Sequence, residues 1–373
     1  SAFTTDATAV VADADVDVVV EVMGGIEPAR ELVSAALSAG KPVVTANKEL
    51  LANHGAELYE AAEAAGVDLL FEAAVAGAIP IMRPLRESLA GEPITRVMGI
   101  VNGTTNFILS RMADDGVSYA DALAEAQGLG YAERDPTADV EGFDAGAKAA
   151  IIATVAFGAR VVAGDVYHEG ISGITVADIE FAADLQHCIK LLAVVEQTRA
   201  SDGGLQIGVR VHPTLVPLDH PLASVRGSFN AVFVEGGASG DLMFYGRGAG
   251  GRPTASAVLG DLIDAAGNLR RGHGAPIGAL ERARIAPIDD VTSAFYLNVE
   301  VDDRPGVLAQ VATVFGENGV SIRSMEQEGL GGEARLVFIT HAARERDLRS
   351  TLQGLRSLDA VRAVGSVLRV IGD

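Results

Sequence analysis

The first 75 residues show short, continuous apolar runs that alternate with segments of helical periodicity. The runs predicted to be strands are residues 17–23, 41–46 and 67–75. The helices predicted between them are residues 28–39 and 47–66, the first with Pro28 near its start and Gly40 at its end. Continuous apolar strands that alternate with helices predict a parallel sheet covered on both faces.

Between residues 79 and 280, longer helices mix with strands, which predicts a second unit of the α+β type. The helices are predicted at 139–163, 176–187 and 253–267, and the strands at 94–101, 189–197, 205–211 and 229–235. We interpret this unit as a substrate-binding and dimerisation domain, although residues 253–270 could instead complete the first unit. Gly, Arg and Pro are frequent in 268–287, which indicates a linker.

From residue 295 onward the predicted order is strand, helix, strand, strand, helix, strand. These elements are predicted at 295–302, 304–319, 320–329, 333–341, 345–358 and 360–371. This order is typical of a ferredoxin-like sandwich, with four antiparallel strands and two helices on one face. The chain is therefore predicted to be an α/β protein with units at 1–78, 79–280 and 295–373 and a linker at 281–294.

The amino-acid composition limits the kinds of molecule that this protein is expected to bind. The 373 residues carry a net charge of −21, which argues against nucleic acid, because phosphate binding needs clustered Lys and Arg. The single cysteine, Cys188, excludes an intramolecular disulfide and a cysteine-based metal site. The start of the chain lacks a signal-peptide pattern, and no apolar run reaches the roughly 18 residues of a membrane span. We expect a cytoplasmic protein that binds small molecules or other subunits.

Residues 127–148 gather carboxylates around one lysine. Asp144 and Lys148 are four positions apart and would share one face of a helix, while Glu133 and Asp139 come from the preceding segment rich in Gly and Pro. An acid cluster with one amine suits a cationic, polar small molecule. Such a pair is also common on a solvated helix face, but the apolar helix that follows favours a functional site.

The sequence TANKELL places Thr45, Asn47 and Lys48 where a parallel strand ends and a helix begins. Open α/β sheets bind ligands at this edge, so a cofactor or substrate is one interpretation. The other is that Asn47 caps the helix and Lys48 is solvated. A cation in the first turn of a helix is mildly unfavourable, which gives Lys48 an unusual position if it has no function.

The sequence GRGAGG at 246–251 matches the dinucleotide motif G-x-G-x-x-G only formally, because no strand ending in an acidic residue follows its helix. We interpret it either as a loop whose glycines approach a ligand or as a plain turn. The first 100 residues contain no such motif. Since the strand at 17–23 resembles the fourth strand of a Rossmann domain, we expect the earlier strands and the pyrophosphate loop to be missing from this chain.

Two further strand ends carry polar groups. Glu72 precedes a turn containing Gly77 and Pro80, and one carboxylate with carbonyl oxygens from an irregular turn suits a hard cation. A plain charge at a strand end is an equal alternative. Asn102 lies where a strand meets the helix predicted after NGTTNFIL, either as a cap or as a ligand contact.

Together the motifs resemble two known families. DRPGVLA and ENGVSI are similar to the ACT domain, whose members bind amino acids. The ordered set EVMGG, TANKELL, EAAVAGAIPI, NGTTNFIL, GYAERDPTADVEGFDAGAK and GRGAGGRPTASAVLGD, followed by that domain, resembles homoserine dehydrogenase of the monofunctional type. The resemblance covers essentially the whole chain. It implies NAD(P)-dependent, reversible hydride transfer between homoserine and aspartate semialdehyde, a step toward threonine, methionine and isoleucine.

The resemblance also implies roles for individual residues. Catalysis falls to Lys148 and Lys48, and substrate binding to Glu133, Asp139, Asp144 and Lys148. Cofactor contacts fall to Thr45, Asn47, Lys48, Gly130, Gly248 and Gly250. A monovalent cation, expected to be sodium, falls to Glu72, Val75, Gly77 and Ile79. The amino-acid effector, expected to be threonine, falls to Asp303, Gly306, Val307 and Asn318.

One departure from the family pattern is Arg134, which stands where the motif Glu-Pro-Asp-Pro has its first proline and adds a positive charge beside the site. Two other functions stay open. The chain could be an amino-acid sensor whose dehydrogenase half is catalytically silent. A different semialdehyde or hydroxy-acid dehydrogenase is less favoured, because Cys188 has no activating partner nearby in the sequence. Pairing of ACT sheets leads us to expect a homodimer or homotetramer.

Overall fold

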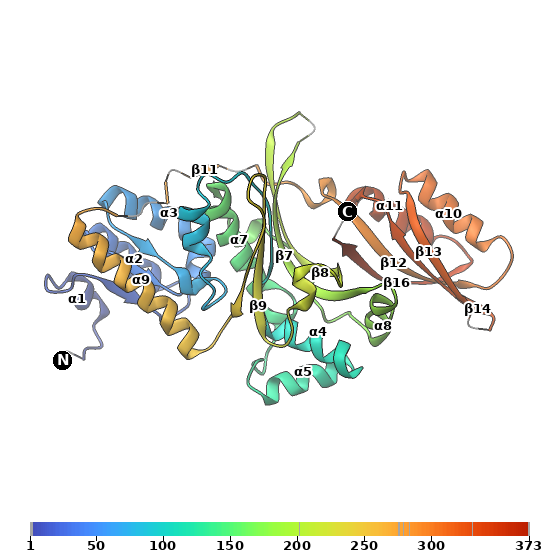
Figure 1. The fold of residues 1–373 in the computed structure, drawn as a ribbon, viewed down its shortest axis with the longest axis horizontal. Coiled ribbons are helices and arrows are strands. Elements are labelled where there is room, and N and C mark those ends of the chain that lie inside the picture. Colours follow the sequence, from blue (N-terminus) through green and yellow to red (C-terminus); the bar gives the residue numbers. More distant parts are fainter. Residues whose placement is uncertain are drawn as a thin grey trace.

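The chain forms a row of three structural parts in the computed structural model (Figure 1). A small α/β part holds the N-terminus, a tall antiparallel sheet stands in the middle, and a second α/β sandwich holds the C-terminus. The structure describes residues 3–200, 202–274, 277–278, 280–282, 284–329 and 331–371.

The N-terminal part is a parallel sheet of order β1-β2-β3. Its strands are β1 (Val19–Glu21), β2 (Val43–Thr45) and β3 (Leu69–Leu70), and its first helices are α1 (Ala7–Ala12), α2 (Ala29–Ser38) and α3 (Lys48–Ala65). The parallel sheet predicted from the apolar runs is confirmed. Helix α9 (Gly251–Arg271) packs on it, because Ala265 is buried against Val44 and Leu70.

The predicted strand 67–75 is too long. The chain leaves the sheet after Leu70 and forms the short 3₁₀ helix η1 (Glu72–Ala74). Left-handed backbone follows at Ala76 and Gly77, where φ is 57° and 59°. No periodicity signals this departure, because it depends on the hydrogen bonds of Glu72 described below.

The central sheet is antiparallel, with the order β10-β9-β4-β7-β8. Its strands are β4 (Ile94–Ile100), β7 (His187–Arg199), β8 (Leu205–Pro217), β9 (Phe229–Gly236) and β10 (Gly240–Arg247). The helices of this part are η2 (Pro84–Ser88), α4 (Gly103–Asp115), α5 (Tyr119–Gly128), α6 (Thr137–Val140), α7 (Phe143–Phe157) and α8 (Val176–Asp184). The prediction of one helix over 139–163 is wrong, because Gly142 has φ 83° and separates α6 from α7.

The C-terminal part confirms the predicted ferredoxin-like order. Its strands pair as β16-β12-β14-β13, and both helices pack on one face. The elements are β12 (Thr292–Asp302), α10 (Val307–Glu317), β13 (Ile322–Gly329), β14 (Glu333–Thr340), β15 (Ala343–Arg344), α11 (Glu345–Arg356) and β16 (Val361–Val370).

The central and C-terminal sheets are continuous, which the sequence did not predict. Arg369 and Val370 of β16 pair in parallel with Thr214 and Leu215 of β8. The segment expected to be a linker also pairs with the central part, since β11 (Glu281–Arg282) lies beside β5 (Ala159–Arg160) and Ile285 forms a bridge with Ile207. Backbone hydrogen bonds therefore join parts that the sequence suggested were only tethered.

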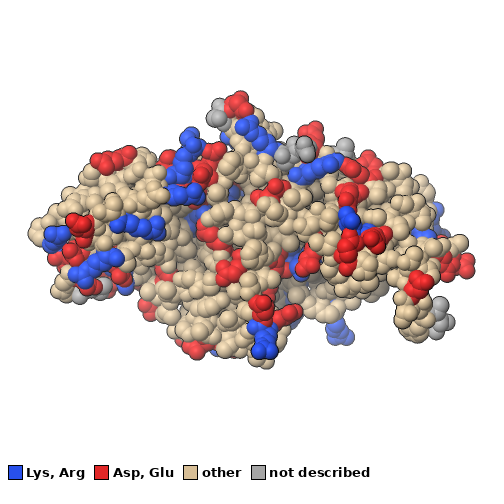
Figure 2. All heavy atoms as spheres, turned by 180° about the vertical axis from the view of Figure 1, so that it is seen from behind, with Lys and Arg blue, Asp and Glu red and all other residues tan. Residues whose placement is uncertain are grey.

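Acidic and basic side chains are intermixed on the face of the molecule opposite to that of Figure 1. The face opposite to Figure 1 shows red and blue groups side by side, with no large continuous basic area (Figure 2). Within the described part of the chain, no helix is both long enough and apolar enough to cross a membrane.

Candidate active site

The predicted acid and lysine residues meet between the N-terminal and central parts. Lys48 is the first residue of α3, directly after β2, whereas Asp144 and Lys148 lie one turn apart on α7. The two carboxylate oxygens of Asp144 lie 3.2 Å from Lys48 Nζ and 2.7 Å from Lys148 Nζ. Lys148 Nζ also donates to the main-chain oxygen of Val101, at 2.7 Å. One carboxylate thus holds two ammonium groups from different parts of the fold.

Asn102 completes this cluster, and the structure confirms one of the two roles considered for it, that of a helix cap. Its Oδ1 accepts from Thr105 N at 2.9 Å and so caps α4. Its Nδ2 donates to Asp139 Oδ1 at 2.7 Å and to Asp144 Oδ2 at 2.9 Å. The amide therefore places the two carboxylates side by side.

The two carboxylates have opposite electrostatic environments. Burial by itself raises the pKa of Asp144, but the charges of Lys148 and Lys48 and their hydrogen bonds outweigh it and lower that pKa to about 2. Burial raises the pKa of Asp139, and the negative charge of Asp144 adds to the effect. Asp144 is therefore the fixed anion of the site, and Asp139 takes up a proton more readily.

The loop after β2 is held by buried polar contacts. Thr45 Oγ1 donates to Glu21 Oε2 at 2.6 Å, and Asn47 N donates to Thr45 Oγ1 at 3.0 Å. Asn47 caps α3 through Leu50 N and also donates to the carbonyl of Gly25. Sequence reasoning missed Glu21, although an acidic residue in a strand of valines was the available signal. Since Thr45 and Asn47 are buried and bonded, the half-buried Lys48, whose side chain is 38% exposed, is the polar side chain of this loop that is open to a ligand.

Two predicted ligand-contacting glycines, Gly77 and Gly248, touch each other. A Cβ on Gly77 would lie 2.4 Å from the carbonyl oxygen of Gly248. A Cβ on Gly248 would lie 2.0 Å from Asn230 Nδ2, and Ala78 N donates to the carbonyl of Arg247. Gly250 has φ 121° at the N-cap of α9. The loop before α9 is therefore pressed onto the turn after η1, which only glycine permits.

The carboxylate of Glu72 acts as a cap for the chain that follows. It accepts hydrogen bonds from the amides of Ile81, Met82 and Arg83, while Glu72 N donates to Asp261 Oδ2 at 2.8 Å. A carboxylate used in this way is not free to face a cation, so a cation here would rely on the carbonyls of Glu72, Val75, Gly77 and Ile79. Among the described residues, no group of three or more His, Cys, Asp or Glu could hold a metal ion.

Asp261 of α9 is a second buried acid that sequence reasoning missed. Burial raises its pKa to about 6, although its bonds from Glu72 N and from Arg83, 2.9 Å away, act in the opposite direction. The available signal was an acid in the interior of a helix that packs on the parallel sheet.

Other predicted site residues lie apart from the cluster. Glu133 is exposed, and its main-chain oxygen accepts from Gln127 Nε2 at 3.0 Å. Arg134 is exposed too, and Gly130 has φ 77° in the turn after α5. The structure does not bring the Glu133 carboxylate to Asp144 or Lys148.

The four predicted effector residues occupy the two ends of α10. Gly306, with φ 89°, caps its start beside Asp303 and the buried Val307, while Asn318 follows its last residue and donates to the carbonyl of Val314. A helix of 11 residues is about 16 Å long. Asn318 of one chain therefore cannot share a small ligand with Gly306 of the same chain.

Comparison with family models agrees with this arrangement. Residues 80–263 match the model described as homoserine dehydrogenase, residues 1–72 match the NAD binding domain of homoserine dehydrogenase, and residues 295–360 match the ACT domain. A homoserine dehydrogenase from Corynebacterium glutamicum is 57% identical over 371 residues, which are 99% of this chain and 83% of that protein. The chain belongs to the homoserine dehydrogenase family.

Solved structures support the same family. A homoserine dehydrogenase from Thiobacillus denitrificans superposes with a TM-score of 0.93 at 43% identity, covering 99% of this chain and 85% of that one. A hyperthermophilic archaeal homoserine dehydrogenase mutant in complex with NADPH has a TM-score of 0.61 at 33% identity, over 71% and 76% of the two chains. The chain is thus an oxidoreductase with an NAD-binding part and an ACT domain, and a catalytically silent sensor is not favoured.

Cys188 remains outside this chemistry. It lies on β7, and burial raises the pKa of its thiol, although Lys190 and Arg226 partly offset this. A thiol with a raised pKa is a poor nucleophile at neutral pH.

Proposed function

We propose that this chain carries the site for reversible hydride transfer between NAD(P) and the homoserine and aspartate semialdehyde pair. The observation that supports it best is Asp144, which holds Lys48 and Lys148 together at the junction of the NAD-binding part and α7. A hydride-transfer site needs a polar substrate pocket beside the cofactor. The homoserine dehydrogenase name of the Corynebacterium relative supports the choice of substrate.

Lys148 is proposed to orient and polarise the reacting oxygen. An ammonium group has three N–H donors. Lys148 donates one to Asp144 and one to the carbonyl of Val101. The third donor is left for the substrate oxygen, and the proton exchanged there passes to or from water. Lys48 assists from the cofactor side, because it is 38% exposed and opposes Lys148 across Asp144.

The carboxylates are proposed to bind the substrate ammonium group. Asp139 and Asp144 stand side by side on Asn102, so an ammonium can bridge them. Glu133 would join them only if the exposed turn that carries it closes over the substrate. Arg134 on the same turn could then attract the substrate carboxylate.

NAD(P) is proposed to lie along the loop after β2, toward the turn at Gly130 and the loop before α9. When bound, it accepts or supplies the hydride. Lys48 contacts it directly, whereas the buried Thr45 and Asn47 hold the shape of the loop. Gly248 and Gly250 let the backbone approach closely.

A sodium ion is proposed to sit at the turn after η1, held by the carbonyls of Glu72, Val75, Gly77 and Ile79. The left-handed backbone at Ala76 and Gly77 supports this, because it turns successive carbonyls out of a regular pattern. The test is thermal unfolding in sodium chloride and in choline chloride at equal ionic strength. A higher melting temperature in sodium is expected, and equal temperatures would contradict the site.

Threonine is proposed as the effector at Asp303, Gly306 and Val307, with Asn318 supplied by a second copy. The separation of the two ends of α10 supports this pairing, and a homodimer or homotetramer follows from it. The cytoplasm is proposed as the location on separate grounds, because the chain belongs to a family of biosynthetic enzymes. Calorimetric titration of threonine, with sedimentation to measure subunit number, tests both. Threonine binding by a monomer would contradict the shared site.

The decisive experiment is Lys148→Ala in the full-length protein, assayed as homoserine-dependent reduction of NAD(P). Turnover should be lost while circular dichroism and cofactor binding stay unchanged. Lys41→Ala is a matched control, since Lys41 is a lysine of the N-terminal part that bonds to the carbonyl of Asp13. Normal turnover by Lys148→Ala would remove the proposed role of Lys148. A wild type without homoserine turnover would remove the function itself.

A further inference from the structure

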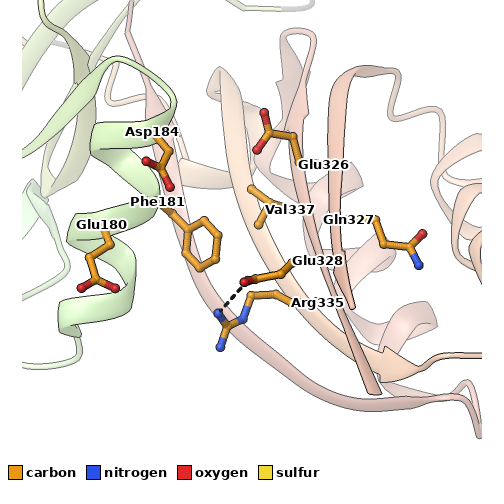
Figure 3. Close-up of a pocket in the computed structure, with 8 residues that line it drawn as sticks. All are labelled: Glu180, Phe181, Asp184, Glu326, Gln327, Glu328, Arg335 and Val337. Carbon is orange, nitrogen blue, oxygen red and sulfur yellow. Dashed lines mark ion pairs between the residues drawn. The ribbon is translucent and has the colours of Figure 1, made fainter. Parts of the chain in front are cut away.

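A cavity of about 310 Å³ lies between α8 and the C-terminal sheet. The face of that sheet opposite to its two helices is turned toward α8, and Ser366 of β16 donates to Asp178 of α8 at 2.8 Å. In Figure 3, Phe181 and Asp184 project from α8 toward the strands that carry Val337 and Arg335. The walls of the cavity thus come from two domains.

The sheet beside the cavity contains a buried polar group without a partner. The strand register places Asn298, Val337 and Glu326 in one row across β12, β14 and β13, so their side chains share one face of the sheet. Val337 and Glu326 line the cavity. Asn298 is only 8% exposed, and its Oδ1 has no hydrogen-bond partner among the described residues. A buried amide oxygen without a donor is uncommon, and here it lies in the row of residues that also holds the cavity-lining Val337 and Glu326.

Arg335 is a cation with unused donors. Its guanidinium stacks over the ring of Phe181, with 5.1 Å between Cζ and the ring centroid. Its carboxylate neighbours, Glu328 and Glu300, lie at 3.7 Å and 3.9 Å, beyond hydrogen-bonding distance. Its Nε is buried and has no partner in the described part of the chain. A planar guanidinium held in this way can receive a carboxylate in a bidentate fashion.

The remaining charges around the cavity are negative. Glu180 and Asp184 come from α8, and Glu326 and Glu328 come from β13. Four carboxylates and one guanidinium line the cavity, so a ligand with a single positive charge would leave an excess of negative charge in it. A ligand with two ammonium groups and one carboxylate would match both Arg335 and the acids, with its methylene chain over Phe181 and Val337.

We propose that this cavity binds a basic α-amino acid of the lysine type. The ligand carboxylate pairs with Arg335, and its α-ammonium group bonds to Glu326. Its side-chain ammonium meets Asp184 and Glu180. The site differs from the catalytic cluster and from the effector residues at α10, and it does not rest on the proposed function. Helix α8 also packs on α4, whose N-cap is Asn102. Ligand binding would therefore link the position of the C-terminal domain to the proposed catalytic residues around Asp144.

The test is calorimetric titration of L-lysine into the full chain. Saturable binding with one lysine per chain is expected. Cadaverine lacks the carboxylate and 6-aminohexanoate lacks the α-amino group, so each should bind at least tenfold more weakly. No heat with millimolar L-lysine would overturn the proposal. Equal binding of cadaverine, or displacement of lysine by magnesium at equal concentration, would overturn it too, because each would show an acidic patch only.

Variants locate the site. Arg335→Gln should weaken lysine binding at least tenfold, and Glu326→Gln provides an independent change should Arg335→Gln fail to fold. Glu317→Gln, an exposed acid at the end of α10, is the matched control and should bind normally. Lys148→Ala should also bind lysine normally, which separates this site from the substrate site. Unchanged binding by both cavity variants, or its loss in Lys148→Ala alone, would overturn the assignment.

Discussion

Asp144 and Lys48 belong to different structural parts, yet Asp144 Oδ1 lies 3.2 Å from Lys48 Nζ. Lys148, one turn along α7, takes the other carboxylate oxygen. This shared carboxylate makes the geometry of the proposed catalytic cluster depend on how the NAD-binding part packs against α7. The cluster consists of Lys48, Asn102, Asp139, Asp144 and Lys148.

Asp144→Asn tests this dependence. The neutral amide cannot hold two ammonium groups, so kcat/KM should fall about 100-fold or more, as when a catalytic group is misplaced. Homoserine oxidation at saturating cofactor measures the effect. Asp135→Asn is a suitable control, because Asp135 is an exposed acid of the preceding turn that bonds only within that turn. Comparable loss in both variants would contradict a specific role for Asp144.

Asp144 should also appear in the pH dependence of stability. The pKa of its carboxyl is about 2 in the folded chain, against an ordinary value of 3.8. Ionised Asp144 therefore stabilises the fold above pH 4 by roughly 2 kcal/mol, and this contribution is lost as the pH falls through 2. The unfolding free energies of wild type and Asp144→Asn, measured in urea from pH 7 to pH 2, should converge below pH 4. A constant difference would show that the lysines do not hold the carboxylate.

Asn102 has two separable roles. Asn102→Ser keeps an oxygen to cap α4 but is too short to bridge Asp139 and Asp144, so activity should fall about tenfold or more with little change in melting temperature. Asn102→Ala loses the cap as well and should cost about 1 kcal/mol more. Wild-type kcat/KM in Asn102→Ser would show that the bridge is unimportant.

The contact between Gly77 and Gly248 should not tolerate a side chain. In Gly77→Ala the new Cβ would lie 2.4 Å from the carbonyl oxygen of Gly248, and in Gly248→Ala it would lie 2.0 Å from Asn230 Nδ2. The free energy of unfolding of each variant should therefore fall by about 1–3 kcal/mol. Gly260→Ala is the control, because Gly260 lies inside α9 with open space around it and should gain up to about 1 kcal/mol. Chemical denaturation measures all three. Equal stabilities would mean that the two loops separate freely.

Arg369 should matter to stability far more than a surface arginine on the same strand. It is 6% exposed and forms a bidentate pair with Glu169 at 2.7 Å and 2.9 Å, and it also contacts Glu345. Arg369→Met leaves the carboxylates of Glu169 and Glu345 without their cation, so the free energy of unfolding should fall by about 3–5 kcal/mol.

Arg362→Met on the same strand provides the comparison. Its guanidinium is 47% exposed and pairs with Asp302 and Glu333, so its loss should cost about 1 kcal/mol or less. Urea unfolding measures the stability of both variants. It is followed by far-UV circular dichroism, because the chain contains no tryptophan. A small effect of Arg369→Met would show that the β16 to β8 junction does not depend on this ion pair.

Part of the proposed catalytic cluster could be predicted from local sequence alone. Asp144 and Lys148 are four residues apart, so helix geometry requires them to share a face wherever the helix packs. Lys48 follows a strand end, where parallel sheets present their ligands. Nothing local indicated that Glu72 would cap the amides of Ile81 to Arg83, or that Glu133 would lie outside the cluster. Those outcomes depend on the path of the chain after η1 and in the turn before α6.

The sequence by itself determined the parallel sheet at the start, the ferredoxin-like order at the end and the family, because these follow from periodicities and motifs that each segment carries. Only the tertiary structure decided that Lys48 meets Asp144, that Gly248 rests on Gly77 and that β16 extends the central sheet beside β8. The physical reason is that these contacts join residues about 100 or more positions apart or depend on which strand edges are free to pair. A local sequence pattern does not specify the packing that brings such residues together.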